Sequence, residues 1–229
     1  MITNQHEKQI EISDHSQCGE GNAGGACGYG DFGRDINGRD VSAVSRLYRN
    51  GSGCGACYQV RCRYPQLCND KGVRVVVTDY GEGDNTDFIL SARAFVKLAH
   101  HNTAARLMAY GTIDVEYRRI SCHYPGHNLI FRVTENSRYP DYLALVILYQ
   151  AGQKDITAVD LWQEDRKEWR GMRRVYGAVW DMVNPPKGPM NMLLQITGDD
   201  GAQNWVQLTD VIPKDWKAGA SYDSAVQLP

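Results

Sequence analysis

Apolar residues along the first half of the chain follow the patterns of short strands interrupted by short helices. Runs over 58–62, 73–80 and 113–120 alternate or stay apolar, which is typical of strands. One helix is expected over 42–48, capped by its first serine, and another begins at Ser91. This half is therefore predicted to be mainly β with two small helices.

The second half shows strand patterns only. Turn residues separate the apolar runs, and no helical periodicity appears between them. Strands this short and frequent predict a β-sandwich. The expected strands cover 128–133, 142–150, 156–163, 192–197, 205–208 and 225–228.

Cysteine and tryptophan are segregated along the chain. All seven cysteines lie at or before Cys122, and all five tryptophans lie between Trp162 and Trp216. A single domain rarely divides its residues in this way, so we place a domain boundary at the turn-forming residues 124–126. The predicted division is an unassigned N-terminal segment, 1–21, and two domains, 22–125 and 126–229.

The composition is that of an ordinary globular protein, with 42% hydrophobic and 23% charged residues and a formal net charge of -2. Without a basic excess, nucleic acid and anionic membranes are not expected partners. The longest apolar run, 142–149, is far shorter than the roughly 20 residues of a membrane-spanning helix. We expect a monomer with no membrane association.

The cysteine density favours a disulfide framework in a secreted domain. Zinc is the competing interpretation, but the spacings do not give two CxxC pairs, so we expect no metal. Residues 1–17 are polar and contain no signal peptide, although the cysteines indicate export. An odd number of cysteines leaves one thiol over, for which Cys18 is the candidate. Asn50 begins a glycosylation sequon, which matters only in an exported protein.

Two familiar motifs do not carry their usual function here. Residues 28–33 fit GxGxxG, but no strand precedes them and no apolar helix follows, so a dinucleotide cofactor is not expected. Residues 54–58 fit the sequence around the papain nucleophile, which requires a histidine about 130 to 150 residues downstream. The last histidine is His127, so a structural role for these cysteines is favoured.

Four carboxylates at and after the end of the strand over 73–80 are candidates for glycoside hydrolysis. That reaction requires a carboxylic acid to protonate the leaving oxygen and a second carboxylate as base or nucleophile. A solvated turn is the alternative, and sequence alone favours it. The candidates are Asp79, Glu82, Asp84 and Asp87.

Aromatic residues of the second half could form a platform on which sugar rings stack. Most aromatic residues of a sandwich belong to its core, and composition alone favours that alternative. The residues considered are Tyr149, Trp162, Trp169, Tyr176 and Trp180.

Several motifs in order make the chain resemble the expansin superfamily, and most closely its plant expansin-like B group. The resemblance covers about residues 22 to 229 and includes cysteines at matching places. Residues 78–84 and 162–165 resemble the B group in particular. The shared motifs lie at 25–30, 53–62, 77–79, 116–122, 142–144, 177–180 and 211–219.

This resemblance implies a six-stranded double-psi β-barrel, related to family 45 endoglucanases, followed by an immunoglobulin-like cellulose-binding β-sandwich. It implies a secreted protein whose partners are plant cell-wall polysaccharides, cellulose and hemicellulose, without a cofactor. It also implies three disulfides: Cys27–Cys54, Cys57–Cys122 and Cys62–Cys68.

The chain departs from the family pattern in the barrel groove. The aligned family stretch carries an aspartate where this chain has Ile89, which cannot transfer a proton. Asp79, after Thr78, matches the other family acid, and Asp87 lies on the same strand face as Ile89 as a partial substitute. The family's first barrel strand, with its Thr-Tyr-Tyr motif, is not found before Cys18, so an exposed barrel edge is expected.

The sequence therefore predicts a non-enzymatic wall protein that stacks sugar rings on aromatic residues and possesses a residual groove. Tyr176 is the first candidate for the platform and Tyr149 the second, whereas Trp180 matches a position that belongs to the core in the alternative interpretation. The rival functions are a weak endoglucanase, using Asp79 with Asp87 or Asp84, and a secreted interaction or defence module on the same scaffold.

Overall fold

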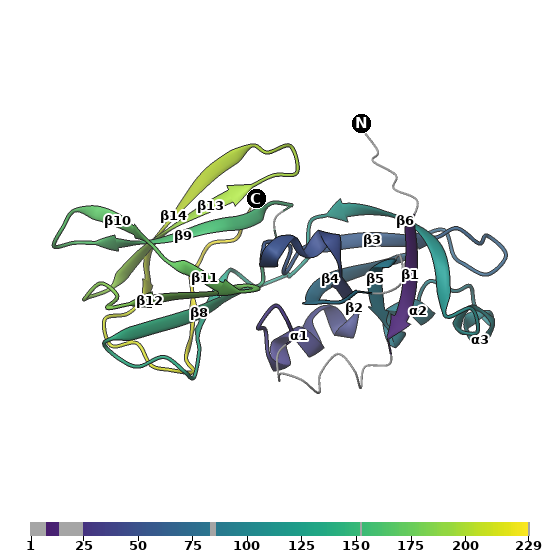
Figure 1. Cartoon of the computed structure of the whole chain (residues 1–229), viewed down its shortest axis with the longest axis horizontal. Helices are drawn as coiled ribbons and strands as arrows, with labels where there is room; N and C mark the ends of the chain where they lie inside the picture. The colour runs from purple at the N-terminus through teal and green to yellow at the C-terminus, as the bar shows by residue number, and fades with distance from the viewer. Residues whose placement is uncertain (1–7, 14–24, 83–85, 152, 229) are drawn as a thin grey trace. The chain divides into compact units, whose positions relative to one another are not determined.

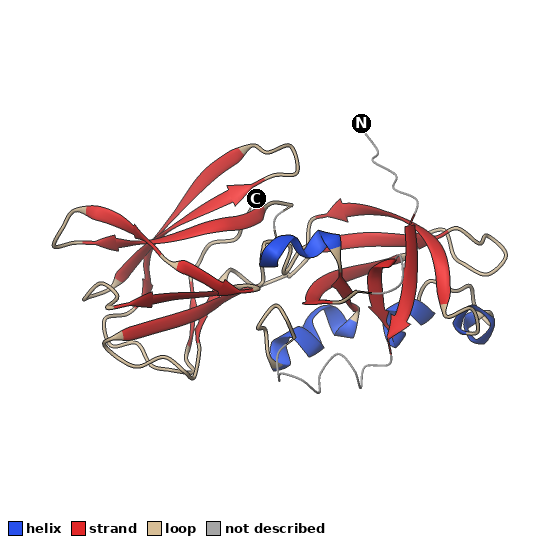
Figure 2. Cartoon of the chain, viewed as in Figure 1, coloured by secondary structure: helices blue, strands red, loops and turns tan. Residues whose placement is uncertain are grey.

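The structure is a computed structural model that describes residues 8–13, 25–82, 86–151 and 153–228. The chain divides into two compact units, Met1–Ser121 and Cys122–Pro229. The division falls just before the turn at which the sequence analysis placed the domain boundary. All described helices belong to the first unit (Figure 2). None of them has the length and apolar character needed to span a membrane.

The first unit is a closed barrel with strand order β1-β5-β2-β4-β3-β6. The β1/β5 and β2/β4 pairs are parallel and the other neighbours are antiparallel, with β1 paired to β6 to close the ring (Figure 1). The six-stranded double-psi barrel expected from the family resemblance is confirmed. Its strands are β1 (Lys8–Ser13), β2 (Val41–Val44), β3 (Cys57–Cys62), β4 (Val73–Tyr80), β5 (Thr86–Ser91) and β6 (Thr112–Ile120).

The expectation of a missing first strand was wrong. β1 lies within the segment 1–21 that was left unassigned, and it fills the place between β5 and β6. Its sequence alternates polar residues with two isoleucines, and Ile10 is fully buried. β1 was not recognised because it lacks the Thr-Tyr-Tyr motif of the family, although its short sequence has the period-2 pattern of a strand.

One of the two expected helices begins where it was predicted. Ser91 is the N-cap of α2, and its hydroxyl oxygen accepts a hydrogen bond from the backbone N–H of Ala94 at 3.2 Å. The helix expected over 42–48 was wrong. All four residues of β2 are buried between β4 and β5, so tertiary packing prevails over a local cap. The helical segments are α1 (Asp31–Asp35), η1 (Ile36–Arg39), η2 (Arg46–Gly51), α2 (Ala92–Val96) and α3 (Ala104–Met108).

The second unit is a sandwich of a four-stranded sheet, β10-β9-β13-β14, and a five-stranded sheet, β11-β12-β8-β7-β15. Five predicted strands are present, but the strand expected over 225–228 is not, and β10, β11, β12 and β15 were missed. The strands are β7 (Ile130–Val133), β8 (Tyr142–Leu148), β9 (Asp155–Gln163), β10 (Glu168–Gly171), β11 (Arg173–Tyr176), β12 (Val179–Val183), β13 (Met190–Thr197), β14 (Gln203–Ile212) and β15 (Ser221–Asp223).

Alternation along the strands decides which side chains fill the sandwich. In β13, Met190, Met192, Leu194 and Ile196 are buried, whereas the residues between them are partly exposed. The buried set belongs to one hydrophobic cluster that contains residues of both sheets. β13 therefore has one face in the core and one outer face. In the five-stranded sheet, by contrast, β8 and β12 contain buried residues on both faces.

Disulfides reinforce the barrel unit. Cys27 is bonded to Cys54, with Cα atoms 5.6 Å apart, and Cys62 to Cys68, at 5.8 Å. These are two of the pairs that the family resemblance implies, and Cys57 and Cys122 are also disulfide-bonded. Cys18 lies outside the described residues.

Candidate functional site

Asp79, near the end of β4, is held by the glycine-rich loop that precedes α1. Its Oδ1 accepts hydrogen bonds from the backbone N–H of Ala26 at 2.6 Å and of Tyr80 at 2.8 Å. Gly25 has φ +61°, and a Cβ there would lie 3.0 Å from the Thr78 carbonyl oxygen and 3.1 Å from the Asp79 carboxyl carbon. Only glycine allows this loop to approach so closely in this conformation.

The environment of Asp79 favours its protonated form. Partial burial raises the pKa of this carboxyl above its ordinary value, and the hydrogen bond from Ala26 opposes part of that rise. Thr78, the preceding residue, is buried in β4. Asp79 therefore keeps its proton to a higher pH than a free carboxyl group does.

Ile89 lies in the same cross-strand row as Asp79. Ala43 of β2 pairs with Asp79 on one side and with Ile89 on the other. Two strand spacings put the Asp79 and Ile89 Cα atoms about 9 to 10 Å apart. The row therefore contains one acid and one hydrocarbon side chain, packed against Gly81.

Asp87 lies in a different environment from Asp79. Its side chain is only 3% exposed, and its Oδ1 accepts a hydrogen bond from the Arg46 Nε at 3.2 Å. Its charge also helps to raise the pKa of Tyr117 to about 12, after burial as the larger cause. Since Arg46 engages Asp87, the structure favours a structural role over substitution for the missing acid.

Tyr80, the last residue of β4, forms an aromatic pair with Tyr48 of η2. The rings of Tyr80 and Tyr48 have centroids 5.2 Å apart, and the Tyr80 hydroxyl donates a hydrogen bond to Glu82. Glu82 is exposed, so it corresponds to the solvated turn that the sequence analysis favoured. Asp84 lies outside the described residues.

Two tyrosines lie on the outer face of the five-stranded sheet. Tyr176 is 52% exposed and pairs with Val179 of β12, and Tyr142 pairs with Val183 of the same strand. Val179 and Val183 are four positions apart on β12, which is about 13 Å along the strand. Both rings therefore lie on the same sheet face, where Tyr176 is exposed and Tyr142 is partly exposed.

An ion pair lies between the two tyrosines. Arg173 donates hydrogen bonds to both Asp181 oxygens, at 3.0 and 2.7 Å, and the Tyr142 hydroxyl donates to Asp181 Oδ2 at 3.0 Å. Arg173 and, secondarily, Tyr142 hold the pKa of Asp181 below its ordinary value. This network was not predicted from the sequence, because its residues come from three strands and two of them, β11 and β12, were not predicted.

The other aromatic candidates are less available to a ligand. Trp180 was wrong as a platform residue: it is 4% exposed and faces the core, with the Arg174 guanidinium 4.1 Å from its ring centroid. Alternation on β12 turns Asp181 outward and Trp180 inward. Tyr149 is partly exposed, but His127 is stacked on its ring at 4.3 Å between centroids.

Trp162 and Trp169 form an edge-to-face pair on the four-stranded sheet, with centroids 5.3 Å apart. They pair across β9 and β10, and both are partly exposed. Asn50 of η2 is exposed, as a glycosylation site requires. Among the described residues, no group of three or more metal-ligating side chains could hold a metal ion.

Comparison with known proteins agrees with this architecture. Residues 129–213 match the family described as the expansin C-terminal domain, and residues 41–117 match one described as lytic transglycolase. The chain is 54% identical over 208 residues to Expansin-like B1 of Arabidopsis thaliana, covering 90% of this chain and 83% of that protein. This chain belongs to the expansin-like B group of the expansin superfamily.

A second plant protein and a bacterial expansin structure are also similar to this chain. Expansin-like B1 of Oryza sativa subsp. japonica is 46% identical over 212 residues, covering 91% of this chain and 83% of that protein. The crystal structure of an expansin from Clavibacter michiganensis has a TM-score of 0.70 at 21% identity, covering 98% of each chain. A mutant of that bacterial protein was solved with cellohexaose, also at a TM-score of 0.70.

Proposed function

We propose that this expansin-like protein binds cell-wall polysaccharide without cleaving it, and that the outer face of the five-stranded sheet is the binding surface. The observation that carries the proposal is Tyr176, a large ring exposed on a strand end with Tyr142 on the same face. A sugar ring presents C–H groups that stack on an aromatic face, and the Arg173–Asp181 pair offers hydrogen-bonding groups between the rings. The bacterial expansin solved with cellohexaose supports a glucan as the ligand class.

The barrel groove supports the non-hydrolytic part of the proposal. Asp79 faces Ile89 across Ala43, so the row lacks the second carboxyl group that a hydrolytic pair requires. Asp87, the proposed substitute, is engaged by Arg46. The groove would then contact polysaccharide without completing the chemistry.

Secretion to the cell wall is part of the same proposal. The barrel disulfides would persist in an oxidising compartment, where the exposed Asn50 would also meet the glycosylation machinery. We propose cellulose and hemicellulose as partners and a monomer as the working form.

Retention on insoluble cellulose and on washed cell walls tests the binding surface. We expect Tyr176→Ala to weaken retention about fivefold, because one stacked ring contributes on the order of 1 kcal/mol. Tyr110→Ala is a matched control, because Tyr110 is a similarly exposed tyrosine of the barrel unit. If wild type and Tyr176→Ala are retained equally well, the surface has been assigned wrongly; if wild type is not retained, the binding function itself is wrong.

The raised pKa of Asp79 favours one second candidate, a weak endoglucanase in which Asp79 is the general acid. Reducing ends released from soluble glucan, and lost in Asp79→Asn, would establish it. No release between pH 3 and pH 8 would exclude it.

A further inference from the structure

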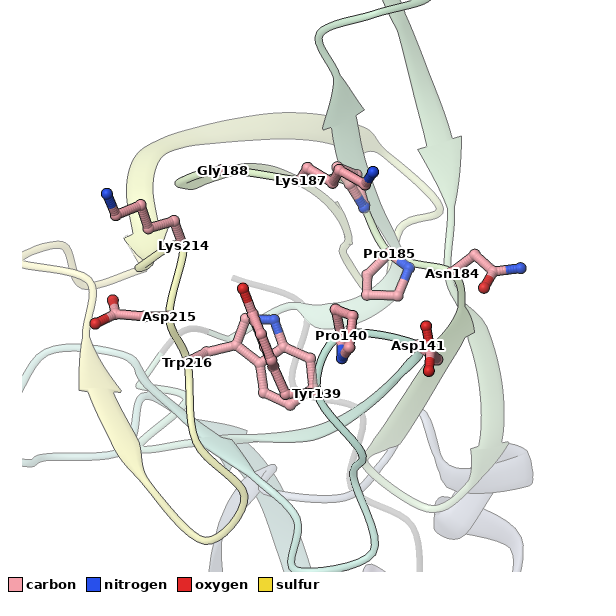
Figure 3. Close-up of a pocket in the computed structure, with 11 residues that line it drawn as sticks. Tyr139, Pro140, Asp141, Asn184, Pro185, Lys187, Gly188, Lys214, Asp215 and Trp216 are labelled. Carbon is pink, nitrogen blue, oxygen red and sulfur yellow. The ribbon is translucent and has the colours of Figure 1, made fainter.

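A pocket of about 420 Å³ lies at one end of the sandwich (Figure 3). Three segments distant in sequence line it: 139–141 before β8, 184–188 between β12 and β13, and 214–216 after β14. Its volume is within the range of about 300–1,000 Å³ typical of small-ligand sites. The residues that line this pocket were not assigned a role above.

An aromatic pair and two prolines form the middle of the pocket. Trp216 is 2% exposed, and the ring of Tyr139, which is 58% exposed, packs edge-on against it at 5.3 Å between centroids. Figure 3 shows the two rings together, with Pro140 and Pro185 beside them. Because proline fixes φ, these walls are preorganised and little order has to be gained on binding.

Polar side chains without partners surround this apolar centre. Within the part of the chain that the structure describes, Lys187, Lys214, Asp141 and Asp215 form no side-chain hydrogen bond or ion pair. Two ammonium groups and two carboxylates give the rim a formal charge of zero. The pocket therefore offers both donors and acceptors, without a net attraction for an anion or a cation.

We propose that this pocket binds a neutral sugar residue at the end or at a branch of a polysaccharide chain. An exposed aromatic face suits the C–H side of a sugar ring, and the rim suits its hydroxyl groups, which both donate and accept. A pocket lined by three loops suits a terminal or branching residue better than the middle of a straight chain. The inference rests on the proposed function for its ligand class, a wall polysaccharide.

The pocket is distant from Tyr176, although Tyr142, at the other end of the same sheet face, directly follows pocket residue Asp141. Tyr176 is level with Val179, at the start of β12, whereas Asn184 of the pocket follows the last residue of that strand. Five residues of extended strand span about 17 Å. One bound chain could contact Tyr176 through its middle while a distant end or branch entered the pocket, and each site can be removed without the other.

Titration of the full chain with soluble sugars tests the pocket. The probes are cellohexaose, a xylose-branched glucan oligosaccharide and an oligogalacturonate of similar length, with the indole N–H signal of Trp216 followed by NMR. We expect saturable shifts with a neutral probe, and about fivefold weaker affinity in Tyr139→Ala from the loss of the stacked ring. Lys214→Ala should weaken the same binding, whereas Lys217→Ala, a nearby exposed lysine outside the pocket, should not.

The outcomes separate this inference from the proposed function. A Trp216 signal that does not move with either neutral probe, or affinities unchanged in both Tyr139→Ala and Lys214→Ala, would overturn the pocket assignment. Tighter binding of the oligogalacturonate would overturn the neutral-sugar assignment. The dependence of cellulose retention on Tyr176 tests only the proposed sheet surface. The pocket assignment and the proposed binding function can therefore be rejected separately.

Discussion

Replacement of Asp87 by asparagine distinguishes a structural carboxylate from a catalytic one. The Asp87 side chain is 3% exposed and is engaged by Arg46, whose own side chain is 74% exposed. Loss of one partner of a fully buried pair costs about 3–5 kcal/mol. Because the Arg46 guanidinium is largely in water, solvent screening reduces this coupling, and we expect Asp87→Asn to lower the free energy of unfolding by about 1–2 kcal/mol.

Urea denaturation at pH 7 measures this effect, with Arg46→Ala and the double variant completing a thermodynamic cycle. Arg46→Ala should be at least as destabilising as Asp87→Asn, because it removes a cation that pairs with the buried carboxylate. Retention on cellulose should be unchanged in every folded variant. Additive effects of the two substitutions, or a stability unchanged by Asp87→Asn, would refute the argument for a structural ion pair.

Three further substitutions test other parts of the structure. Trp180→Ala should cost about 3–5 kcal/mol in urea unfolding because Trp180 is a core residue, whereas Trp205→Ala, at a 50% exposed position, should cost under about 1 kcal/mol. Burial raises the pKa of Asp79, so the folded state binds this proton more tightly than the unfolded state does. The protonated carboxyl therefore stabilises the fold most at a pH below the ordinary carboxyl pKa. This stabilisation is lost as the pH rises through the raised pKa. Asp79→Asn should therefore flatten the stability profile there in urea titrations between pH 3 and 7. In a secretory host, Asn50→Gln should remove an enzymatically releasable glycan, seen as a mass shift.

The sequence predicted the elements whose apolar pattern is continuous. The run over Val73–Tyr80 coincides with β4, which is buried between β2 and β3, so its side chains had to be apolar on both faces. β10 and β11 escaped prediction because they are only four residues long and partly exposed, and their pairing is provided by β9 and β12. Edge strands of this kind are specified by their neighbours rather than by their own periodicity.

The candidate sites were predictable only as far as single residues. Asp79 and Tyr176 were identified from family motifs, but neither motif indicates that Ala43 brings Asp79 and Ile89 into one row. The pocket around Tyr139 was not foreseen, because its lining comes from three separate loops. Contacts between loops depend on the packing of the sheets that hold them, which no local pattern encodes.

Two features of the barrel bear on its role: the backbone that holds Asp79 and the residue that lies opposite it. Gly25 and the Ala26 N–H still hold Asp79 in position, which is the costly part of building a carboxyl site because it requires a positive φ and a close backbone approach. A second carboxyl group opposite Asp79 would require only one side-chain change on β5. At that position the chain has Ile89, packed against Gly81. Asp79 is thus held in position, whereas its row contains no second carboxyl group. Under the proposed function, we therefore expect the affinity for polysaccharide to depend on Tyr176 rather than on Asp79.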